Sequence, residues 1–465
     1  MVDFALMKDL KNPNKPLNLF SSHLGKLESP VVRYAFFPPH WRIASASKLA
    51  AASSIRCASS PAQRPLRLAV LGAGFAGLSV AWHLLELASK DLSLCIDIYD
   101  EVGIGGGASG VAGGLVHPYS PKAKLLWKGA ECWKECLKLL NISEASVSSR
   151  ESKNLSRDNC HDELLVWRRG ILRPATTLRN VDILNENAQN CLGECRIESI
   201  DKEAASNLIP NMCMPYNSAI YMPEAININP QPYLKALFFA CKKLTEESTA
   251  SGYGGKKIYL HKMSVNRLLE LGGEYNAVII CLGAKADMLP ELSGKLPLRT
   301  CRGVIAHLQL PQDIRDEYGE HSPSILSDAW IAARGRRNLV MGSTWEWRSR
   351  NYSPNVSADE ASMALEELVP KVSAVYPGIQ NWTLTEARAG VRAMPPKTPI
   401  GSLPLLGCID DFVNGDHRCK HWLFGGLGSR GLLYHAWLGK IMAQAVLSCN
   451  ESLIPSELTS WRKLQ

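Results

Sequence analysis

The chain has 465 residues, of which 46% are hydrophobic and 21% charged, so it can bury a large core and is long enough for two or three domains. Residues 1–57 hold eight Lys and Arg against three Asp and Glu, so +5 of the formal net charge of +8 lies there. The remaining +3 argues neither for nor against a polyanionic partner, and no apolar run is long enough to predict a membrane span.

Residues 1–57 predict an organelle-targeting segment, because they are rich in Ser, Ala and basic residues and poor in acids. The tract "SASKLAAASSIRCASS" resembles a plant chloroplast transit peptide, and Ile55–Ala58 is similar to the processing pattern of such peptides. We therefore expect a chloroplast protein. A mitochondrial location and a disordered cytosolic tail are the alternatives.

The first predicted folding unit is a β-α-β unit. Residues 66–71 form an apolar run typical of a buried strand, residues 78–88 have helical periodicity, and residues 94–99 return to a strand pattern. Asp100 follows the second strand directly, where its carboxylate can accept hydrogen bonds from a ribose diol.

Three glycines between the first strand and the helix, Gly72, Gly74 and Gly77, fit the pattern G-x-G-x-x-G. The first allows a tight turn, the second lets backbone approach a pyrophosphate, and the third lets the helix pack close to the strand. Because strand, helix, second strand and acid all agree, we predict a dinucleotide site rather than a chance glycine loop. FAD and NAD both fit this pattern.

A second glycine run, "EVGIGGGASGVAGGLVHP", follows Asp100 and includes Ala108 and Ser109. Its glycines suit backbone that passes close to a bulky planar ligand or its phosphates, so we predict cofactor contacts from these two residues. A flexible surface loop is the alternative. His117 and Tyr119 come next and could line the site, although a lone histidine more often has only a packing role.

The remaining elements alternate along the chain. Residues 146–225 mix polar loops with short strands, and a helix begins at prolines after Asn229. The apolar run 275–284 predicts a buried parallel strand that ends at Gly283, and residues 298–386 have a pattern that suits an antiparallel sheet. We therefore predict a nucleotide domain made of residues 66–145, 226–290 and 386–450, with a second domain made of 146–225 and 298–385 inserted into it.

Fourteen cysteines are scattered through predicted helices and strands, and we expect buried free thiols. The pairs Cys132/Cys136 and Cys191/Cys195 lack the further ligands that a zinc site needs, so no metal is predicted.

The stretch "GLGSRGLLYHA", residues 426–436, places glycines and Arg430 immediately before a predicted helix near the end of the chain. With "GASGVAGGLVHP", "NPQPYLKAL", "CLGA", "GST" and "GVRA", it completes an order of motifs that resembles the D-amino-acid-oxidase-like FAD oxidoreductases, which include glycine and sarcosine oxidases. The resemblance covers about residues 66–447. Within that family, the chain is similar to the C-terminal oxidase half of the bacterial bifunctional enzyme that makes the methylaminomethyl group of wobble uridine in tRNA.

The resemblance implies an α/β fold with a Rossmann-like FAD-binding domain and an inserted α+β substrate domain built on a mainly antiparallel sheet. It implies FAD as the cofactor, held also by Gly283, Gly428 and Gly431. The terminal turn and its helix N-terminus would stabilise the charge that collects on the reduced flavin. Arg430 could add a positive charge or bind substrate, whereas a plain helix N-cap turn is the alternative.

Arg392 in "GVRA" is the candidate substrate ligand, since the family's arginine binds a carboxylate through its two-pronged guanidinium. A structural ion pair is the alternative. The family's acidic residue after this arginine is absent from "RAMPPKTPIGSLPLLG". Trp345, Glu346 and Trp347 follow "GST"; they could form an aromatic wall, but core packing is the favoured interpretation.

The expected function is oxidation of the C–N bond of a small-molecule amino acid or secondary amine, by hydride transfer to FAD. A second hypothesis is removal of carboxymethyl from a modified tRNA uridine, which predicts a basic surface around the pocket. A third is a flavin-binding scaffold or assembly factor without turnover. The arginines considered for tRNA are Arg168, Arg169, Arg173, Arg334, Arg336 and Arg337.

Overall fold

A computed structural model describes residues 65–151, 164–250, 255–271, 273–315, 318–413 and 419–464. The transit peptide expected at residues 1–57 lies outside them. By their contacts, Pro61–Gln465 form one compact unit.

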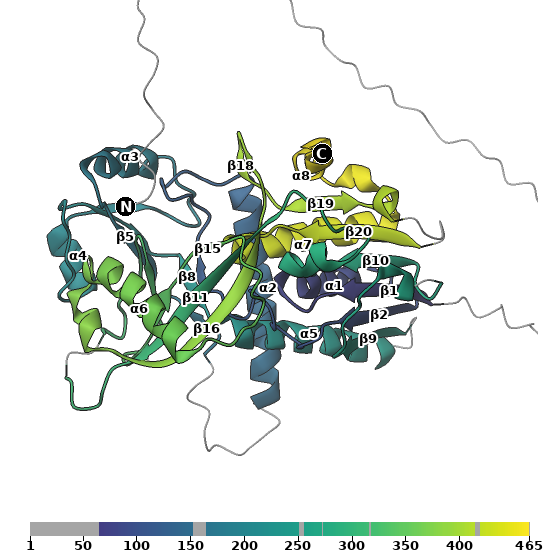
Figure 1. The fold of residues 1–465 in the computed structure, drawn as a ribbon, viewed down its shortest axis with the longest axis horizontal. Helices are drawn as coiled ribbons and strands as arrows, with labels where there is room; N and C mark the ends of the chain where they lie inside the picture. Colours follow the sequence, from purple (N-terminus) through teal and green to yellow (C-terminus); the bar gives the residue numbers. More distant parts are fainter. Residues whose placement is uncertain are drawn as a thin grey trace, which may run out of the picture. The chain divides into compact units, whose positions relative to one another are not determined.

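A six-stranded sheet lies at one end of this unit (Figure 1). Five neighbouring strands are parallel, and one edge strand is antiparallel. Its strands come from three separate parts of the chain. In sheet order they are β19 (Leu405–Cys408), β20 (Lys420–Gly425), β10 (Ala277–Ile280), β1 (Leu66–Leu71), β2 (Leu94–Tyr99) and β9 (Lys256–His261).

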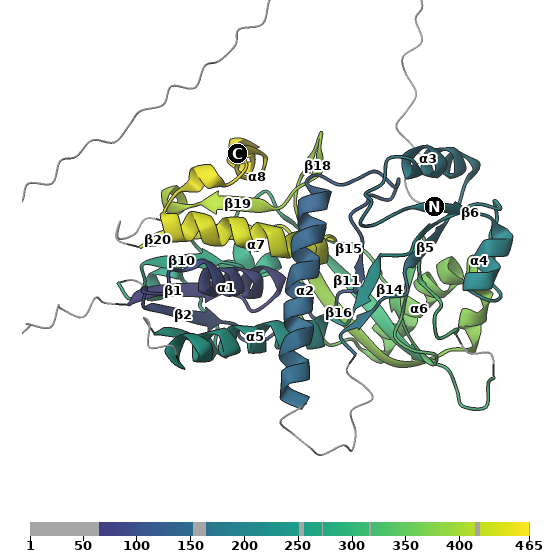
Figure 2. The same cartoon turned by 180° about the vertical axis from the view of Figure 1, so that it is seen from behind.

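Both faces of the six-stranded sheet are covered, because successive side chains of a strand point to opposite faces. Leu68 and Val70 of β1 belong to a core formed with the helices, whereas Ala69 and Leu71 belong to a second core on the other face. The helices that contact one another over the first face are α1 (Phe75–Leu87), α2 (Gly129–Glu151), α5 (Pro230–Ala250) and α7 (Gly431–Ser448), as Figure 2 shows.

A nine-stranded sheet forms the other part and is antiparallel except where β5 pairs with β12. Eight strands follow one another in the order β15 (Glu346–Trp347), β11 (Arg299–Gln309), β14 (Asn338–Gly342), β13 (Trp330–Ala333), β12 (Ser324–Leu326), β5 (Ile171–Pro174), β7 (Ala219–Met222) and β6 (Glu198–Ile200). The ninth, β16 (Thr383–Met394), pairs along the whole of β11.

The smaller elements lie around these sheets. Strands β3 (Leu115–Val116), β8 (Ile226–Ile228) and β4 (Val166–Trp167) form one small sheet, and β17 (Lys397–Thr398) pairs with β18 (Gly401–Ser402). The other helices are α3 (Leu178–Ala188), α4 (Lys202–Leu208), α6 (Ala358–Ser373) and α8 (Ser456–Thr459). Short 3₁₀ turns occupy Leu268–Leu271, Gly283–Met288, Pro377–Asn381, Asp410–Phe412, Glu451–Leu453 and Ser460–Leu464.

The predicted fold class is confirmed, with local differences. The first helix begins at Phe75 rather than Leu78, so the third glycine of the motif lies inside it. The domain boundaries stay a prediction; β16 crosses the one proposed at residue 386 and joins the nine-stranded sheet.

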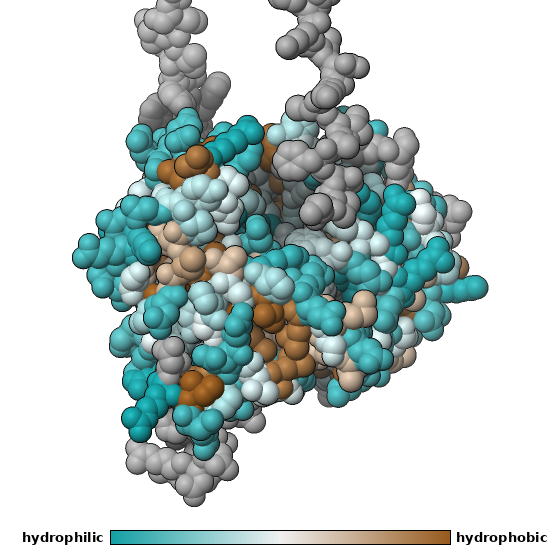
Figure 3. All heavy atoms as spheres, turned by 60° about the vertical axis from the view of Figure 1, so that its left-hand side comes forward, coloured by the Kyte–Doolittle hydropathy of each residue, from teal (hydrophilic) through white to brown (hydrophobic). Residues whose placement is uncertain are grey.

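Among the described helices, none combines the length and the apolarity that crossing a bilayer requires. The face in Figure 3 is mostly hydrophilic, with apolar side chains in a few separate groups.

Candidate active site

A cavity of about 670 Å³ opens at the carboxyl ends of the parallel strands, where ligands bind in open α/β sheets. Leu71 at the end of β1 and Tyr99 at the end of β2 line it, as does Cys281 just after β10. Residues of the nine-stranded sheet, such as Gly303 of β11 and Arg392 of β16, line the opposite side.

The first glycine motif leaves no room for side chains. A Cβ at Gly77 would lie 1.9 Å from the carbonyl oxygen of Gly72, and a Cβ at Gly72 would lie 2.5 Å from that of Cys281. Gly72 also has a φ of +106°, which side-chain-bearing residues rarely adopt. Two roles expected from the sequence, the tight turn and the close packing of helix on strand, are therefore visible in the geometry.

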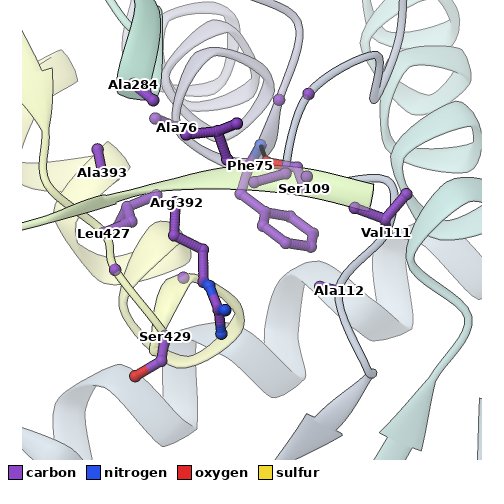
Figure 4. A pocket seen from close by; sticks show the side chains of 18 of the residues that line it. Phe75, Ala76, Ser109, Val111, Ala112, Ala284, Arg392, Ala393, Leu427 and Ser429 are labelled. Atoms are coloured by element: carbon purple, nitrogen blue, oxygen red, sulfur yellow. Dashed lines mark hydrogen bonds between the residues drawn. The ribbon is translucent and has the colours of Figure 1, made fainter. Parts of the chain in front are cut away.

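The two glycine runs meet at the start of α1. The Phe75 N–H donates to the Ser109 hydroxyl over 3.1 Å, and a Cβ at Gly74 would lie 2.7 Å from that oxygen. Figure 4 shows Phe75 and Ser109 together, with Ala76 next in the helix. Helix geometry leaves the next N–H groups of this turn without intrahelical partners, so a pyrophosphate fits here.

Asp100 lines the cavity, and its carboxylate also accepts hydrogen bonds from the first glycine turn and from the loop that follows Asp100. One of its carboxylate oxygens accepts from the Ala73 N–H over 2.9 Å, and the other accepts from the N–H groups of Val102 and Gly103. A carboxylate has about four acceptor positions, so one remains for a ribose hydroxyl. Sequence reasoning missed Glu101, which also lines the cavity and pairs with Lys285.

Helices α1 and α7 begin side by side at the cavity. The Ser79 hydroxyl donates to the carbonyl oxygen of His435 over 2.9 Å, and a Cβ at Gly439 would lie 2.3 Å from that hydroxyl. At the start of the helices, a Cβ at Gly431 would lie 3.4 Å from the Phe75 ring. Two helix N-termini therefore act on the same space, each equivalent to roughly half a positive charge.

The terminal glycine turn is tied directly to the strand that carries Arg392. The Gly428 N–H donates to the carbonyl oxygen of Ala393 over 3.0 Å, and the φ of Gly428 is +56°. Arg430 is the N-cap residue of α7, and it lines the cavity. The remaining predicted cofactor contacts, Ala108 and Gly283, also line it.

The Arg392 guanidinium is fixed in place on the cavity wall. It donates to the carbonyl oxygen of Thr344 over 2.9 Å and to the Ser343 hydroxyl over 3.2 Å, and it lies 4.0 Å from the centre of the Trp345 ring. Burial lowers the pKa of Arg392. Gly303 gives it room, because a Cβ there would lie 2.3 Å from a guanidinium nitrogen. Figure 4 shows the side chain reaching into the cavity from β16.

Two further groups of the cavity carry shifted pKa values. Burial lowers the pKa of Arg173 to about 10, and the nearby charge of Arg430 contributes. Burial, together with Arg430 and Arg173, holds the pKa of His117 well below its usual value. The Tyr119 N–H donates to His117 Nδ1 over 3.3 Å, so the neutral imidazole carries its proton on Nε2.

Other candidates have different positions from those expected. Tyr119 is buried in the core, where its hydroxyl donates to the carbonyl oxygen of Cys195. The tryptophans of "TWEW" are not core residues, since Trp345 is 44% and Trp347 47% exposed, and only Trp345 lines the cavity. A contact with Arg392 explains the position of Trp345. Glu346 is exposed and lies on β15, the strand that pairs with β11.

Of the six arginines considered for tRNA, only Arg173 lines the cavity. Arg168 forms an ion pair with Glu144, and Arg336 forms one with Glu320. The guanidinium of Arg337 donates to backbone carbonyls, and burial lowers the pKa values of Arg169 and Arg334. These side chains do not surround the cavity with free charge.

Comparison with known proteins agrees with this geometry. Residues 67–445 match the family model described as FAD dependent oxidoreductase. Thiamine biosynthesis oxidoreductase ThiO, as a Rhizobium etli protein is named, is 24% identical to this chain over 348 residues. The match covers 72% of this chain and 86% of that protein.

Solved structures with a similar fold include iminodiacetate oxidase from Chelativorans sp. BNC1. Its TM-score is 0.60 at 20% identity, with 84% of this chain and 98% of that chain covered. Glycine oxidase from Geobacillus kaustophilus has a TM-score of 0.58 at 18% identity, with 85% and 98% covered.

The close packing at Gly77 predicts a specific loss of cofactor. In Gly77→Ala the new methyl group would collide with the backbone of Gly72, so we expect α1 to shift and the purified protein to hold less FAD per chain and to melt at a lower temperature. Gly193→Ala is the control, because Gly193 does not line the cavity and has no atom within 4 Å of its Cβ position. A Gly77→Ala protein with the full FAD content and melting temperature of the control would contradict this role.

Proposed function

The chain belongs to the FAD-dependent oxidoreductase family, and from this premise we propose that it oxidises the C–N bond of an amino acid or secondary amine. The proposal rests on Arg392, which binds the carboxylate of the substrate. The names of several similar structures, glycine oxidase and iminodiacetate oxidase among them, support this class of substrate.

Arg392 suits this role because its guanidinium is held before any ligand arrives. Thr344, Ser343 and Trp345 fix its plane, so little side-chain entropy is lost when a carboxylate binds. Its strand is hydrogen-bonded to the glycine turn before α7. A carboxylate at Arg392 therefore has a defined position relative to that turn.

The chain's own residues have little acid-base work to do in such a reaction. FAD, when bound, supplies the acceptor for a hydride, that is for two electrons and one proton. The amine must be neutral at the reacting nitrogen, and the imine that forms is hydrolysed by water. Orientation by Arg392 and the positive field of the two helix N-termini are the contributions of the protein. The acceptor that reoxidises the cofactor, oxygen or a carrier, stays open.

A tRNA substrate is the weaker candidate, since Arg168 and Arg336 are paired with carboxylates and only Arg173 of the six arginines lines the cavity. A scaffold without turnover is weaker too, because Arg392 is positioned although the acidic residue expected after it is missing.

The test of the function is anaerobic mixing of the FAD-loaded protein from Ala58 onward with glycine, sarcosine and other N-substituted amino acids. We expect at least one of them to bleach the flavin absorbance band. Bound FAD that no amine reduces would contradict the proposal and favour tRNA or a scaffold role; unchanged tRNA nucleosides in a knockout would then exclude tRNA.

Substitution of Arg392 should weaken substrate use. Arg392→Lys keeps a charge but loses the two-pronged geometry, so we expect kcat/KM to fall about 10- to 150-fold, mostly through KM. Arg299→Lys is the control, because Arg299 lies 5.1 Å from the Trp347 ring centre in a similar stack but does not line the cavity. Equal losses in both variants would contradict a substrate contact at Arg392.

We also propose that residues 1–57 direct the protein to the chloroplast. A fluorescent protein fused after these residues should be imported into plastids, because their composition is that of a transit peptide. Import into mitochondria, or a diffuse signal in the cytosol, would contradict the proposal.

A further inference from the structure

We propose that Arg173 and Arg430 form a second anion subsite in the cavity, so that the substrate is an amine carrying a second carboxylate besides the one at Arg392. This inference rests on the proposed function and specifies its substrate class.

The two arginines come from different parts of the fold. Arg173 lies on β5 of the nine-stranded sheet, and Arg430 immediately precedes α7. Both line the cavity. Within the part of the chain that the structure describes, neither guanidinium has a hydrogen-bond or ion-pair partner. Arg392, by contrast, has three of its N–H donors engaged by Cys301, Ser343 and Thr344.

Two unpaired guanidinium groups in one cavity are unfavourable without an anion. Burial and the charge of Arg430 both lower the pKa of Arg173, and burial lowers that of Arg430. Like charges in a partly enclosed space repel each other, and a bound anion between them removes this repulsion. Such an arrangement is typical of a binding site rather than of a structural contact.

His117 adds a neutral donor to the same group of side chains. Because its Nδ1 accepts from the Tyr119 N–H, the proton of the neutral ring is on Nε2. The charges of Arg430 and Arg173 act on this imidazole and favour its neutral form. The subsite therefore offers two cations and one N–H donor, which suits a carboxylate.

The lining of the cavity carries a net positive charge. Asp100 is engaged by backbone N–H groups, and Glu101 is paired with Lys285. The charged side chains of the lining are four cations and three carboxylates, a net charge of +1, namely Arg173, Arg392, Arg430 and Lys285 with Asp100, Glu101 and Asp328. A substrate with its one carboxylate at Arg392 would leave Arg173 and Arg430 without an anion among the described residues.

The test is calorimetric titration of the FAD-loaded protein with glutarate and with valerate, which have the same number of carbons but two and one carboxylates. We expect glutarate to bind at least about tenfold more tightly. In Arg173→Gln this preference should disappear while valerate affinity is kept. Arg168→Gln removes a neighbouring exposed arginine outside the cavity and should keep the preference.

Equal affinities for the two acids in the unsubstituted protein would overturn the subsite, as would an undiminished preference for glutarate in Arg173→Gln. In Arg430→Gln, a shifted flavin reduction potential with the preference intact would assign Arg430 to the cofactor and overturn the two-arginine site. Failure of the proposed function is distinct, because it would appear as tight glutarate binding without flavin reduction by any amine.

Discussion

The packing of α1 against α7 is the constraint on which the rest of the site depends. Gly439 lets the two helices approach until the Ser79 hydroxyl reaches the backbone of His435, and His83 adds a contact of 3.1 Å to the carbonyl oxygen of Ala436. The helices are far apart in sequence, yet their N-termini lie next to each other. We expect this single contact to build both the pyrophosphate site and the site for the planar end of the cofactor.

The packing of α1 against α7 concentrates positive charge at the cavity, and this charge determines which ligands the cavity favours. Two adjacent helix N-termini and three arginines raise the potential of one enclosed space. The carboxylates of the lining offset this only in part, because Glu101 is paired with Lys285 and only Asp100 and Asp328 remain against the three arginines. Anions are therefore the natural occupants of both ends, the phosphates at α1 and the acidic groups of a substrate near the arginines.

The parts of the site that could be predicted from the sequence are those formed by residues close together in the chain. The β-α-β unit follows from periodicity and from glycines whose spacing is fixed by backbone collisions at Gly72 and Gly77. Helix α6 was missed, although Ser357 accepts from the Glu360 N–H at its start, a capping signal readable in the sequence. Trp345 was interpreted as core because its contact with Arg392 joins residues 47 positions apart, which no local pattern reveals.

The three cavity arginines differ in a way that only the structure reveals. Arg392 is held by neighbours that accept its hydrogen bonds, so its position is set before a ligand binds. Arg173 and Arg430 have no such neighbours among the described residues, and the charge of Arg430 helps to lower the pKa of Arg173. Because Arg392 is fixed by its neighbours, it gives one group of a ligand a fixed position. Arg173 and Arg430 are stabilised most when a negative group of the ligand binds to them. The first suits a group that must be placed for chemistry, and the second suits a group by which the correct ligand is distinguished from shorter or less charged ones.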